Sequence, residues 1–514
     1  MALNIIINEE LNYKYNNVNN IVYKIHFIII YIIFLIIFKN INNKRQFKNK
    51  NNINNNNNNL SKRLLKVKEL YKFLKLYDIK YNKSECNKLD PINILKQRYN
   101  STPKILCRNG DTSHICYKDD NPLFAYKNGV SCEFRDIIID PSKWKEDGNI
   151  YKGPKDFINK GSPLIFNGFF NIKCKNNIIS EYKGYNFIYN KYFQAWNYNY
   201  NEDEKLEELA PGKTIFFISR NQDSPNLYHG GSEFINSLST MYLLNLEPED
   251  IQIVFLESIK INDDPFYYLY KNLISRGGEP IHIRKLKKKY HISNGIHIPI
   301  NWDSPCFIVT SIPNCRNHRT KTYYFYNKLI DIFIPIKIYN DSFVNYNKEF
   351  FYYPKSTIRI KPNDKNENKK IITFQWRRVW PQGRKGQRRI LGNGPELSDK
   401  ISSLLPNNIL LRLVDTASLS LKDQISLMRN TDYLLGTHGA GLSLIIYAPE
   451  NCIYHEIFNS PRMRGLALFA SLSGHKVYRD IIKAEVKKVD GNEYLFFNEK
   501  EFVKSVINHV KKIF

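Results

Sequence analysis

Residues 434–444, which read Leu-Leu-Gly-Thr-His-Gly-Ala-Gly-Leu-Ser-Leu, place the tightest constraint on the fold. An apolar run enters a glycine-rich turn, and a second apolar run continues to Ala448. This order predicts a buried strand, a tight turn and a short helix. A strand that enters a helix through glycines exposes backbone N–H groups that can hold an anion. Glycine also serves a tight turn through its backbone freedom alone, so the spacing leaves both interpretations open.

Two series of alternating strands and helices surround this segment. In the first we predict strands at 214–219, 251–256, 280–284 and 306–311, and helices at 226–246, 264–276 and 323–332. In the second we predict strands at 371–376, 409–414, 433–435, 453–458 and 476–479, and helices at 397–405, 421–429, 441–447, 465–473 and 499–513. Such alternation is typical of parallel sheets covered by helices. We therefore expect an α/β fold of two Rossmann-like domains, with a ligand-binding cleft between their carboxyl edges.

Composition sets the expected boundaries along the chain. A polar segment at 363–370 separates the two series, and short strands are expected at 136–139 and 164–166. The expected parts are a tail at 1–20, a transmembrane anchor at 21–38, an Asn- and Lys-rich stem at 39–85, a mixed α/β entry region at 86–210, a first Rossmann-like lobe at 211–361, a second Rossmann-like lobe at 371–497 and a C-terminal helix at 498–514.

The apolar segment 21–38 reaches the shortest length that crosses a bilayer. No small-residue cleavage site follows it, which favours a retained membrane anchor over a cleaved signal sequence. Lysines cluster after this segment, and the charge rule taken literally would put the rest of the chain in the cytosol. Sequons at Asn59, Asn82, Asn100 and Asn340 favour the opposite orientation. We expect a single-pass protein of the ER or Golgi whose catalytic part is lumenal.

The eight cysteines agree with a lumenal location, because disulfides form in oxidising compartments. None belongs to a Cys-x-x-Cys pair, so a zinc site is not expected. Cys306 and Cys315 are a candidate disulfide pair. The formal net charge of +27 favours an anionic partner, such as a nucleotide sugar or a membrane surface. No nucleic-acid-binding motif accompanies this charge, so no nucleic-acid partner is expected.

Several motifs in the second half of the chain carry a family resemblance. They are Asp423-Gln424-Ile425, residues 432–442 and Glu456-Ile457, preceded by residues 226–229 (Asn-Leu-Tyr-His) and by 374–378 with 388–391. Together they resemble glycosyltransferase family 61, which includes protein N-acetylglucosaminyltransferases and plant arabinosyl- and xylosyltransferases. The resemblance implies a GT-B-like fold and a UDP-sugar donor. It also implies transfer of GlcNAc or a pentose to a hydroxyl of a protein or polysaccharide.

Some positions depart from the family pattern. Glu233 stands where the family has Asp, Ser443-Leu444 replaces Thr-Asn, and residues 449–451 replace a Pro-Pro-Gly turn. These departures keep a second hypothesis open, a non-catalytic relative that binds nucleotides or glycans. A nicotinamide-dependent oxidoreductase is disfavoured, because its glycine loop should follow the first strand of the fold.

The donor diphosphate needs backbone amides and cations. Guanidinium groups match phosphate oxygens, and His438 is expected to contact phosphate. Glu456, at a strand end, is expected to accept hydrogen bonds from ribose hydroxyls. The candidate donor-binding residues are Arg377, Arg388, Arg389, Gly436, His438, Gly439, Ala440, Gly441, Leu442 and Glu456.

The sequence contains no Asp-x-Asp pair, the usual diphosphate-metal ligand of metal-dependent transferases. We therefore expect metal-independent, inverting transfer, with no metal and no cofactor beyond the UDP-sugar substrate. Inversion needs a base for the acceptor hydroxyl. His229 and Glu233, four residues apart on a predicted helix, share one face and are the candidate bases.

Overall fold

The structure is a computed structural model, and it describes residues 85–118, 130–145, 164–174, 194–201, 205–218, 227–256, 266–298, 314–316, 319–333, 351–352, 369–378, 388–416, 419–459 and 465–514. The predicted anchor at 21–38, the stem up to residue 84, the strand at 306–311 and the polar segment up to residue 368 lie outside these ranges. Within the described ranges, no helix is long and apolar enough to cross a membrane.

The first sheet mixes antiparallel and parallel strands. Its order is β1-β2-β3-β11-β8-β9-β10, with β6 and β7 attached beside β3. The strands are β1 (Lys104–Asn109), β2 (Thr112–Lys118), β3 (Val130–Ile139), β6 (Phe170–Asn171), β7 (Trp196–Asn197), β8 (Thr214–Ile218), β9 (Ile251–Phe255), β10 (Ile281–His282) and β11 (Tyr290–Ile298). Strands β11, β8, β9 and β10 are mutually parallel, whereas β11 pairs with β3 in the antiparallel sense. The parallel part therefore has the Rossmann order 3-2-1-4, and the strands of the entry region extend the same sheet.

Strand β11 was not predicted, because its Ser293-Asn294-Gly295 centre is typical of a turn. Gly295 is required there by a neighbour on β3. A Cβ at this position would lie 1.9 Å from Phe134 Cε2, and Phe134 is fully buried. A close approach of two strands therefore explains a glycine inside a strand.

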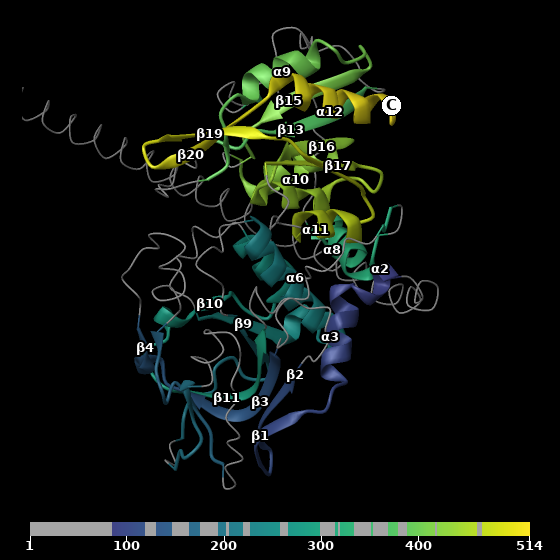
Figure 1. The fold of residues 1–514 in the computed structure, drawn as a ribbon. Helices are drawn as coiled ribbons and strands as arrows, with labels where there is room; N and C mark the ends of the chain where they lie inside the picture. Colours follow the sequence, from purple (N-terminus) through teal and green to yellow (C-terminus); the bar gives the residue numbers. More distant parts are fainter. Residues whose placement is uncertain are drawn as a thin grey trace, which may run out of the picture. The chain divides into compact units, whose positions relative to one another are not determined.

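The second sheet has the order β12-β15-β13-β16-β17-β18 (Figure 1). Its strands are β12 (Phe351–Tyr352), β13 (Lys370–Gln375), β15 (Ile409–Val414), β16 (Tyr433–Thr437), β17 (Ile453–Phe458) and β18 (Lys476–Ile481). All neighbouring pairs are parallel except the edge strand β12. From β13 onward the parallel strands follow the doubly wound order 2-1-3-4-5. The strand order therefore reverses at β13: β15 lies on one side of it, and β16, β17 and β18 lie on the other.

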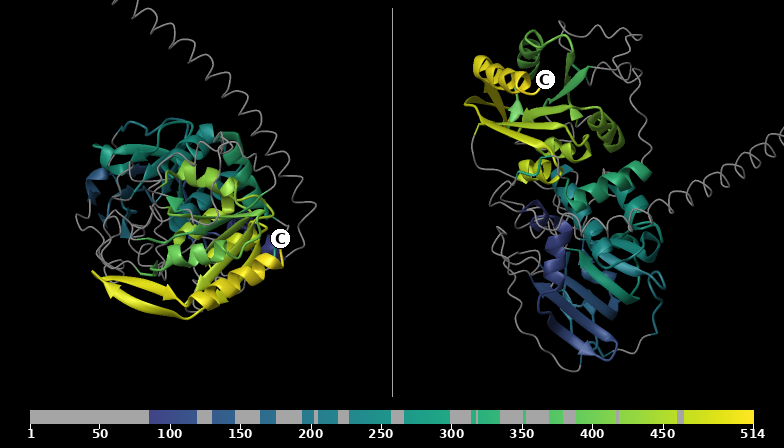
Figure 2. Two further views of the ribbon diagram at one scale, coloured as in Figure 1. Left: turned by 90° about the horizontal axis from the view of Figure 1, so that it is seen from above. Right: turned by 90° about the vertical axis from the view of Figure 1, so that its right-hand side faces the viewer.

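The helices of the second series are α9 (Gly394–Ser402), α10 (Leu421–Arg429), η9 (Ala440–Tyr447), α11 (Gly465–Leu472) and α12 (Glu499–Lys511). The predicted bounds of β15, α10 and β17 are confirmed residue for residue. Helix α10 begins there because Ser420 caps it, accepting from the Asp423 N–H at 3.2 Å and donating to its carboxylate at 2.6 Å. The hairpin of β19 (Ala484–Val489) and β20 (Asn492–Phe497) was not predicted. With β14 (Ile390–Leu391) it forms a separate small sheet, and it leads into α12 in both views of Figure 2.

The structure refines two local predictions. The short helix predicted at 441–447 is the 3-10 helix η9, and the strand predicted at 280–284 is limited to β10, which is followed by a 3-10 turn at Ile283–Lys285. Adjacent β-branched residues at 445 and 446 lower the α-helical propensity of η9. His282 ends β10 because its ring accepts a hydrogen bond from the Arg284 N–H at 3.1 Å.

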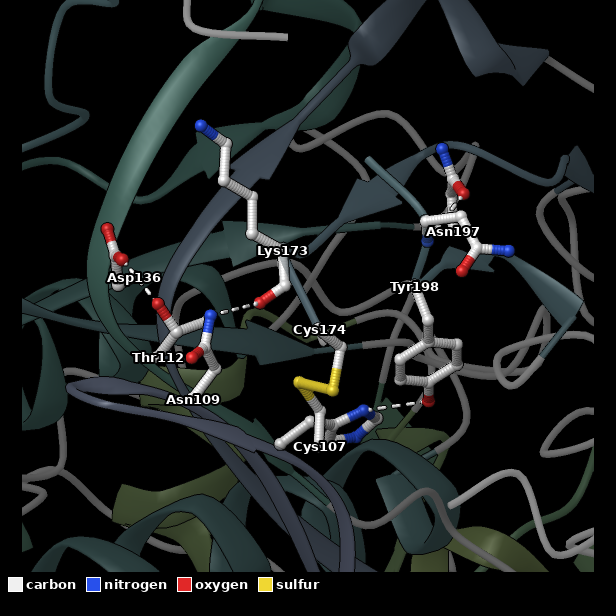
Figure 3. Close-up of a disulfide and its surroundings, with 10 residues drawn as sticks. Cys107, Asn109, Thr112, Asp136, Lys173, Cys174, Asn197 and Tyr198 are labelled. Carbon is white, nitrogen blue, oxygen red and sulfur yellow. Dashed lines mark hydrogen bonds between the residues drawn. A yellow bond between two sulfur atoms is a disulfide. The ribbon is translucent and has the colours of Figure 1, made fainter. Parts of the chain in front are cut away.

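The described residues contain three disulfides: Cys86–Cys315, Cys107–Cys174 and, between the neighbouring strands β2 and β3, Cys116–Cys132. The predicted Cys306–Cys315 pair is wrong, because Cys315 bonds to Cys86 beside α2 (Glu85–Lys88), with Cα atoms 5.8 Å apart. Figure 3 shows Cys107 of β1 bonded to Cys174, beside the 2.6 Å hydrogen bond from Thr112 to Asp136. Pairing across a separation of 229 residues cannot be found from local sequence.

Helix α6 (Leu227–Leu243) follows β8, and nearly all of its side chains are buried. Helix α8 (Lys321–Phe333) precedes the second series but packs against η9. Asn327 donates to the Ile446 carbonyl at 2.7 Å, and the hydroxyls of Tyr326 and Tyr447 are 2.5 Å apart. Elements of both series therefore surround η9.

Buried histidines make the fold sensitive to acid. Burial lowers the pKa of His114, His297 and His475 to about 3. An unfolded histidine titrates near pH 6.5, so the unfolded chain binds more protons than the native chain between pH 6.5 and 3. Stability is therefore full above pH 6.5 and falls as the pH drops, by up to about 1.4 kcal/mol per pH unit for each histidine.

Urea denaturation of the oxidised protein at pH 7.5, 6, 5 and 4 measures this effect. We expect the free energy of unfolding to fall steadily along the series, and the fall to become shallower in His114→Gln. A free energy that does not change between pH 7.5 and 4 would contradict neutral burial of these rings.

Candidate functional site

The glycine-rich segment lies at the point where the second sheet reverses direction. Strand β16 ends at Thr437, and its parallel neighbour β13 ends at Gln375. Arg377 follows β13, and its Nη1 donates to the His438 carbonyl at 3.2 Å, bridging the two strand ends. In open parallel sheets, ligands bind outside the carboxyl ends of the strands at such a reversal.

The glycines of this segment are required by side chains that lie against the backbone. A Cβ at Gly439 would lie 1.9 Å from Arg377 Nη1, and a Cβ at Gly441 would lie 1.4 Å from Gln375 Nε2. A Cβ at Gly436 would lie 2.9 Å from Leu442 Cδ2. The backbone at Gly439 is extended and η9 begins at Ala440, so the first amides of η9 follow directly on the strand end. Close approach explains why this turn uses glycine.

Glu456 is the carboxylate beside this turn. It lies on β17 in register with Gly436 and is completely buried. Its Oε1 is 2.5 Å from His438 Nδ1, and its Oε2 is 3.5 Å from Arg479 Nε on β18. His438 stacks on Phe458, and the Arg479 guanidinium lies 4.4 Å from the same ring. Glu456 therefore positions both the histidine and the arginine.

Two further groups surround Glu456. Burial, then the nearby Glu456 carboxylate, raises the pKa of Tyr454 well above its ordinary value. Burial lowers the pKa of Arg389, an effect that the charge of Glu456 opposes. Arg389 also has a φ of 65°, a left-handed conformation that is uncommon for a side chain of this size. The site thus holds one buried carboxylate among several cationic groups.

The two candidate bases lie on α6, which packs against η9. His229 is partly exposed in the first turn, whereas Glu233 is buried one turn later. The ring centroid of Tyr228, beside them, lies 4.9 Å from that of Phe469 on α11, and the Tyr228 phenol makes a small contribution to the raised pKa of Tyr454. The start of α6 therefore lies near the residues that surround Glu456.

Other predicted residues are placed differently. Arg388 is largely exposed, and its Nε lies 3.9 Å from a Glu493 carboxylate oxygen of β20. Leu442 is buried against Gly436. The Ser443 hydroxyl donates a hydrogen bond to the Ala440 carbonyl at 2.7 Å. Ser443, which replaces the threonine of the family pattern, therefore stabilises the start of η9. Asp432 accepts from the Ile371 N–H at 2.8 Å and fixes the start of β13.

Comparison with known families adds one decisive finding. Residues 282–454 match the family model Glycosyltransferase 61. These residues form a glycosyltransferase 61 region. The match runs from β10 to β17, so the region includes the glycine turn and Arg377, while α6 precedes it and Glu456 follows it. No curated protein matches the chain.

Membership of this region in the family points to a glycosyltransferase.

Four residues that lie at the candidate site were not predicted to belong to it: Arg479, Phe458, Tyr454 and Gln375. Arg479 was placed in a predicted strand without a role, because only the β17–β18 register brings it opposite Glu456. The alternation of Tyr454, Glu456 and Phe458 on one strand face was the available signal.

Proposed function

We propose that this protein transfers a sugar, GlcNAc or a pentose, from a UDP-sugar to a hydroxyl of a protein or glycan, with inversion and without a catalytic metal. The observation that carries this proposal is the position of the glycine turn and Arg377 at the reversal point of a parallel sheet. A GT-B-like pair of lobes, with the first lobe holding the acceptor, completes the proposal.

The donor diphosphate is the ligand that suits this turn. The amides at Gly439, Ala440 and Gly441 start a helix, where negative charge is stabilised. Arg377 and Arg389 supply positive charge, and His438 is oriented by Glu456 so that its other ring nitrogen can meet the ligand. Because the Glu456 oxygens face His438 and Arg479, we assign Glu456 to positioning these residues rather than to the ribose.

Transfer with inversion is a displacement at the anomeric carbon. The acceptor oxygen forms a bond to that carbon as the bond to the UDP oxygen breaks, and the acceptor proton passes to a base. The negative charge that develops on UDP is stabilised by fixed cations and amides. These groups are already held in place by the protein, which is the condition for effective electrostatic stabilisation.

His229 is the better candidate base. It is partly exposed at the start of α6, whereas Glu233 is 1 % exposed one turn later and out of reach of an acceptor. We assign Glu233 to a supporting position on the same helix face.

An ER or Golgi location with a lumenal catalytic part belongs to the same proposal. It is supported by three disulfides, which persist in oxidising compartments. Anchoring through residues 21–38 remains a prediction from the sequence.

A panel of UDP-sugars with peptide and glycan acceptors tests the proposed activity. We expect one UDP-sugar to bind with micromolar affinity and to be turned over equally well with EDTA or with added Mn²⁺. His229→Gln is expected to lower kcat by a factor of 10²–10⁴ with little change in donor affinity, since a general base contributes about that much.

Two outcomes would overturn parts of the proposal. Donor binding without hydrolysis or transfer to any acceptor would favour the non-catalytic relative, for which the altered Glu233 position gives a reason. Turnover that requires Mn²⁺ would exclude the metal-independent route.

A further inference from the structure

The opposite face of β17 from Glu456 carries a second cluster of polar groups. Side chains alternate along a strand, so His455 points away from the glycine turn. It meets Asp480 at the end of β18 and His509 near the end of α12. These three residues come from separate elements, and nothing in the proposed transfer uses them.

Three donors converge on one oxygen of Asp480. Its Oδ2 lies 3.1 Å from His455 Nε2 and 3.0 Å from His509 Nε2, and it also accepts from the Ser505 hydroxyl. The rings of His455 and His509 are nearly perpendicular, with centroids 4.8 Å apart. The two nitrogens and the carboxylate oxygen all lie within 4.8 Å of one another.

This arrangement matches the ligand set of a transition-metal ion. Two imidazole nitrogens and a carboxylate oxygen are ordinary zinc ligands, and at tetrahedral zinc neighbouring ligand atoms are about 3.3 Å apart. We propose that His455, Asp480 and His509 bind one zinc ion, with Ser505 or water as the fourth ligand.

The surroundings of the cluster support metal binding. A zinc-bound histidine donates its second N–H to a fixed acceptor. The Tyr433 hydroxyl lies 2.7 Å from His455 Nδ1, where its oxygen can accept a hydrogen bond from this N–H. Asp480 is 30 % exposed and His509 is 19 % exposed, so an ion can enter from solvent.

The ion would join the C-terminal helix to the sheet. Helix α12 follows the β19–β20 hairpin and otherwise rests on apolar contacts of Phe502, Val506 and Val510. A zinc ion would add bonds from α12 to β17 and β18. This role is structural, since Glu456 and the glycine turn lie on the other face of β17.

Zinc titration of the oxidised, chelator-treated protein tests the proposal. We expect one zinc ion per chain, submicromolar affinity in competition with a chromogenic chelator, and a Tm raised by about 5 °C or more at saturation. His509→Gln and Asp480→Asn retain hydrogen-bonding groups of similar size. Each is expected to lower the affinity at least 100-fold and to abolish the Tm shift, whereas Tyr433→Phe is expected to lower the affinity about 10–100-fold.

His291→Gln is the matched control. His291 lies 2.7 Å from Asp136 in the first sheet, a similar His–Asp contact without a third ligand. Its removal should leave zinc affinity unchanged. An absence of stoichiometric zinc binding in the wild-type protein, or equal affinity in Asp480→Asn, would reduce the cluster to a hydrogen-bonded contact and overturn the proposal. UDP binding is measured on the same variants, so that a failure of the zinc proposal can be told apart from a failure of the proposed transferase activity.

Discussion

Glu456→Gln is expected to weaken UDP binding about 10–100-fold, although the substitution preserves the shape of the side chain. The carboxylate holds His438 on one oxygen and Arg479 on the other, and it is fully buried. A hydrogen bond to a charged group contributes about 1.5–3 kcal/mol, which corresponds to this loss of affinity. Removing one partner of a buried ion pair also destabilises the fold, here by about 3 kcal/mol.

A double-mutant cycle separates positioning from direct contact. His438→Ala should lower UDP affinity by a similar factor while the protein stays folded, although the buried Glu456 carboxylate then loses one partner and folding stability falls as well. If Glu456 acts through His438, the double variant should bind UDP no more weakly than the weaker single variant, because the two losses are coupled. Isothermal titration at 25 °C gives the affinities, and urea denaturation gives the stabilities. Fully additive losses would mean that Glu456 acts independently of His438, either through Arg479 or by meeting the ligand itself, as first expected for a ribose contact.

Gly439→Ala is expected to lower UDP affinity at least tenfold while the protein stays folded. The added methyl group would lie 1.9 Å from Arg377 Nη1 and 3.1 Å from Cζ, so the guanidinium must leave the His438 carbonyl. The end of this long, partly buried side chain can move at small cost to stability, but it then no longer points at the proposed diphosphate position. A charge-assisted bidentate contact depends on that geometry.

Gly231→Ala is the matched control for this substitution. A Cβ at Gly231, in the middle of α6, would meet the Phe266 ring at an ordinary 3.6 Å. Alanine is favoured over glycine inside a helix by about 1 kcal/mol, so this variant should be slightly more stable and bind UDP normally. Unchanged UDP affinity in Gly439→Ala would remove Arg377 from the donor site.

The second sheet was predictable because its strands and helices are short, regular and separated by clear signals. Strand β17 is buried throughout and has apolar residues at both ends, and α10 begins at a capping serine. In the first sheet β11 was missed, since its central glycine serves a packing contact rather than a turn. The β19 strand was missed because most of its side chains are exposed, which leaves no apolar alternation to detect.

Only part of the candidate site could be predicted from the sequence. His438 and Arg377 lie beside strong local signals, a glycine turn and a strand end. Arg479 and the Cys86–Cys315 pair depend on strand register and on contacts across the chain, which no local pattern contains. Glu456 was predicted as a residue of the site, but its contacts with His438 and Arg479 were not, because these partners come from other elements.

The packing around η9 has a consequence for the thermodynamics of binding. This short helix is held by α6, α8, α10 and α11, and its residues from Leu442 to Tyr447 are buried. The amides before it consequently have little conformational entropy left to lose when a ligand arrives. Binding therefore does not carry the free-energy cost of ordering a loop at this turn. Tight binding is consequently possible with few contacts.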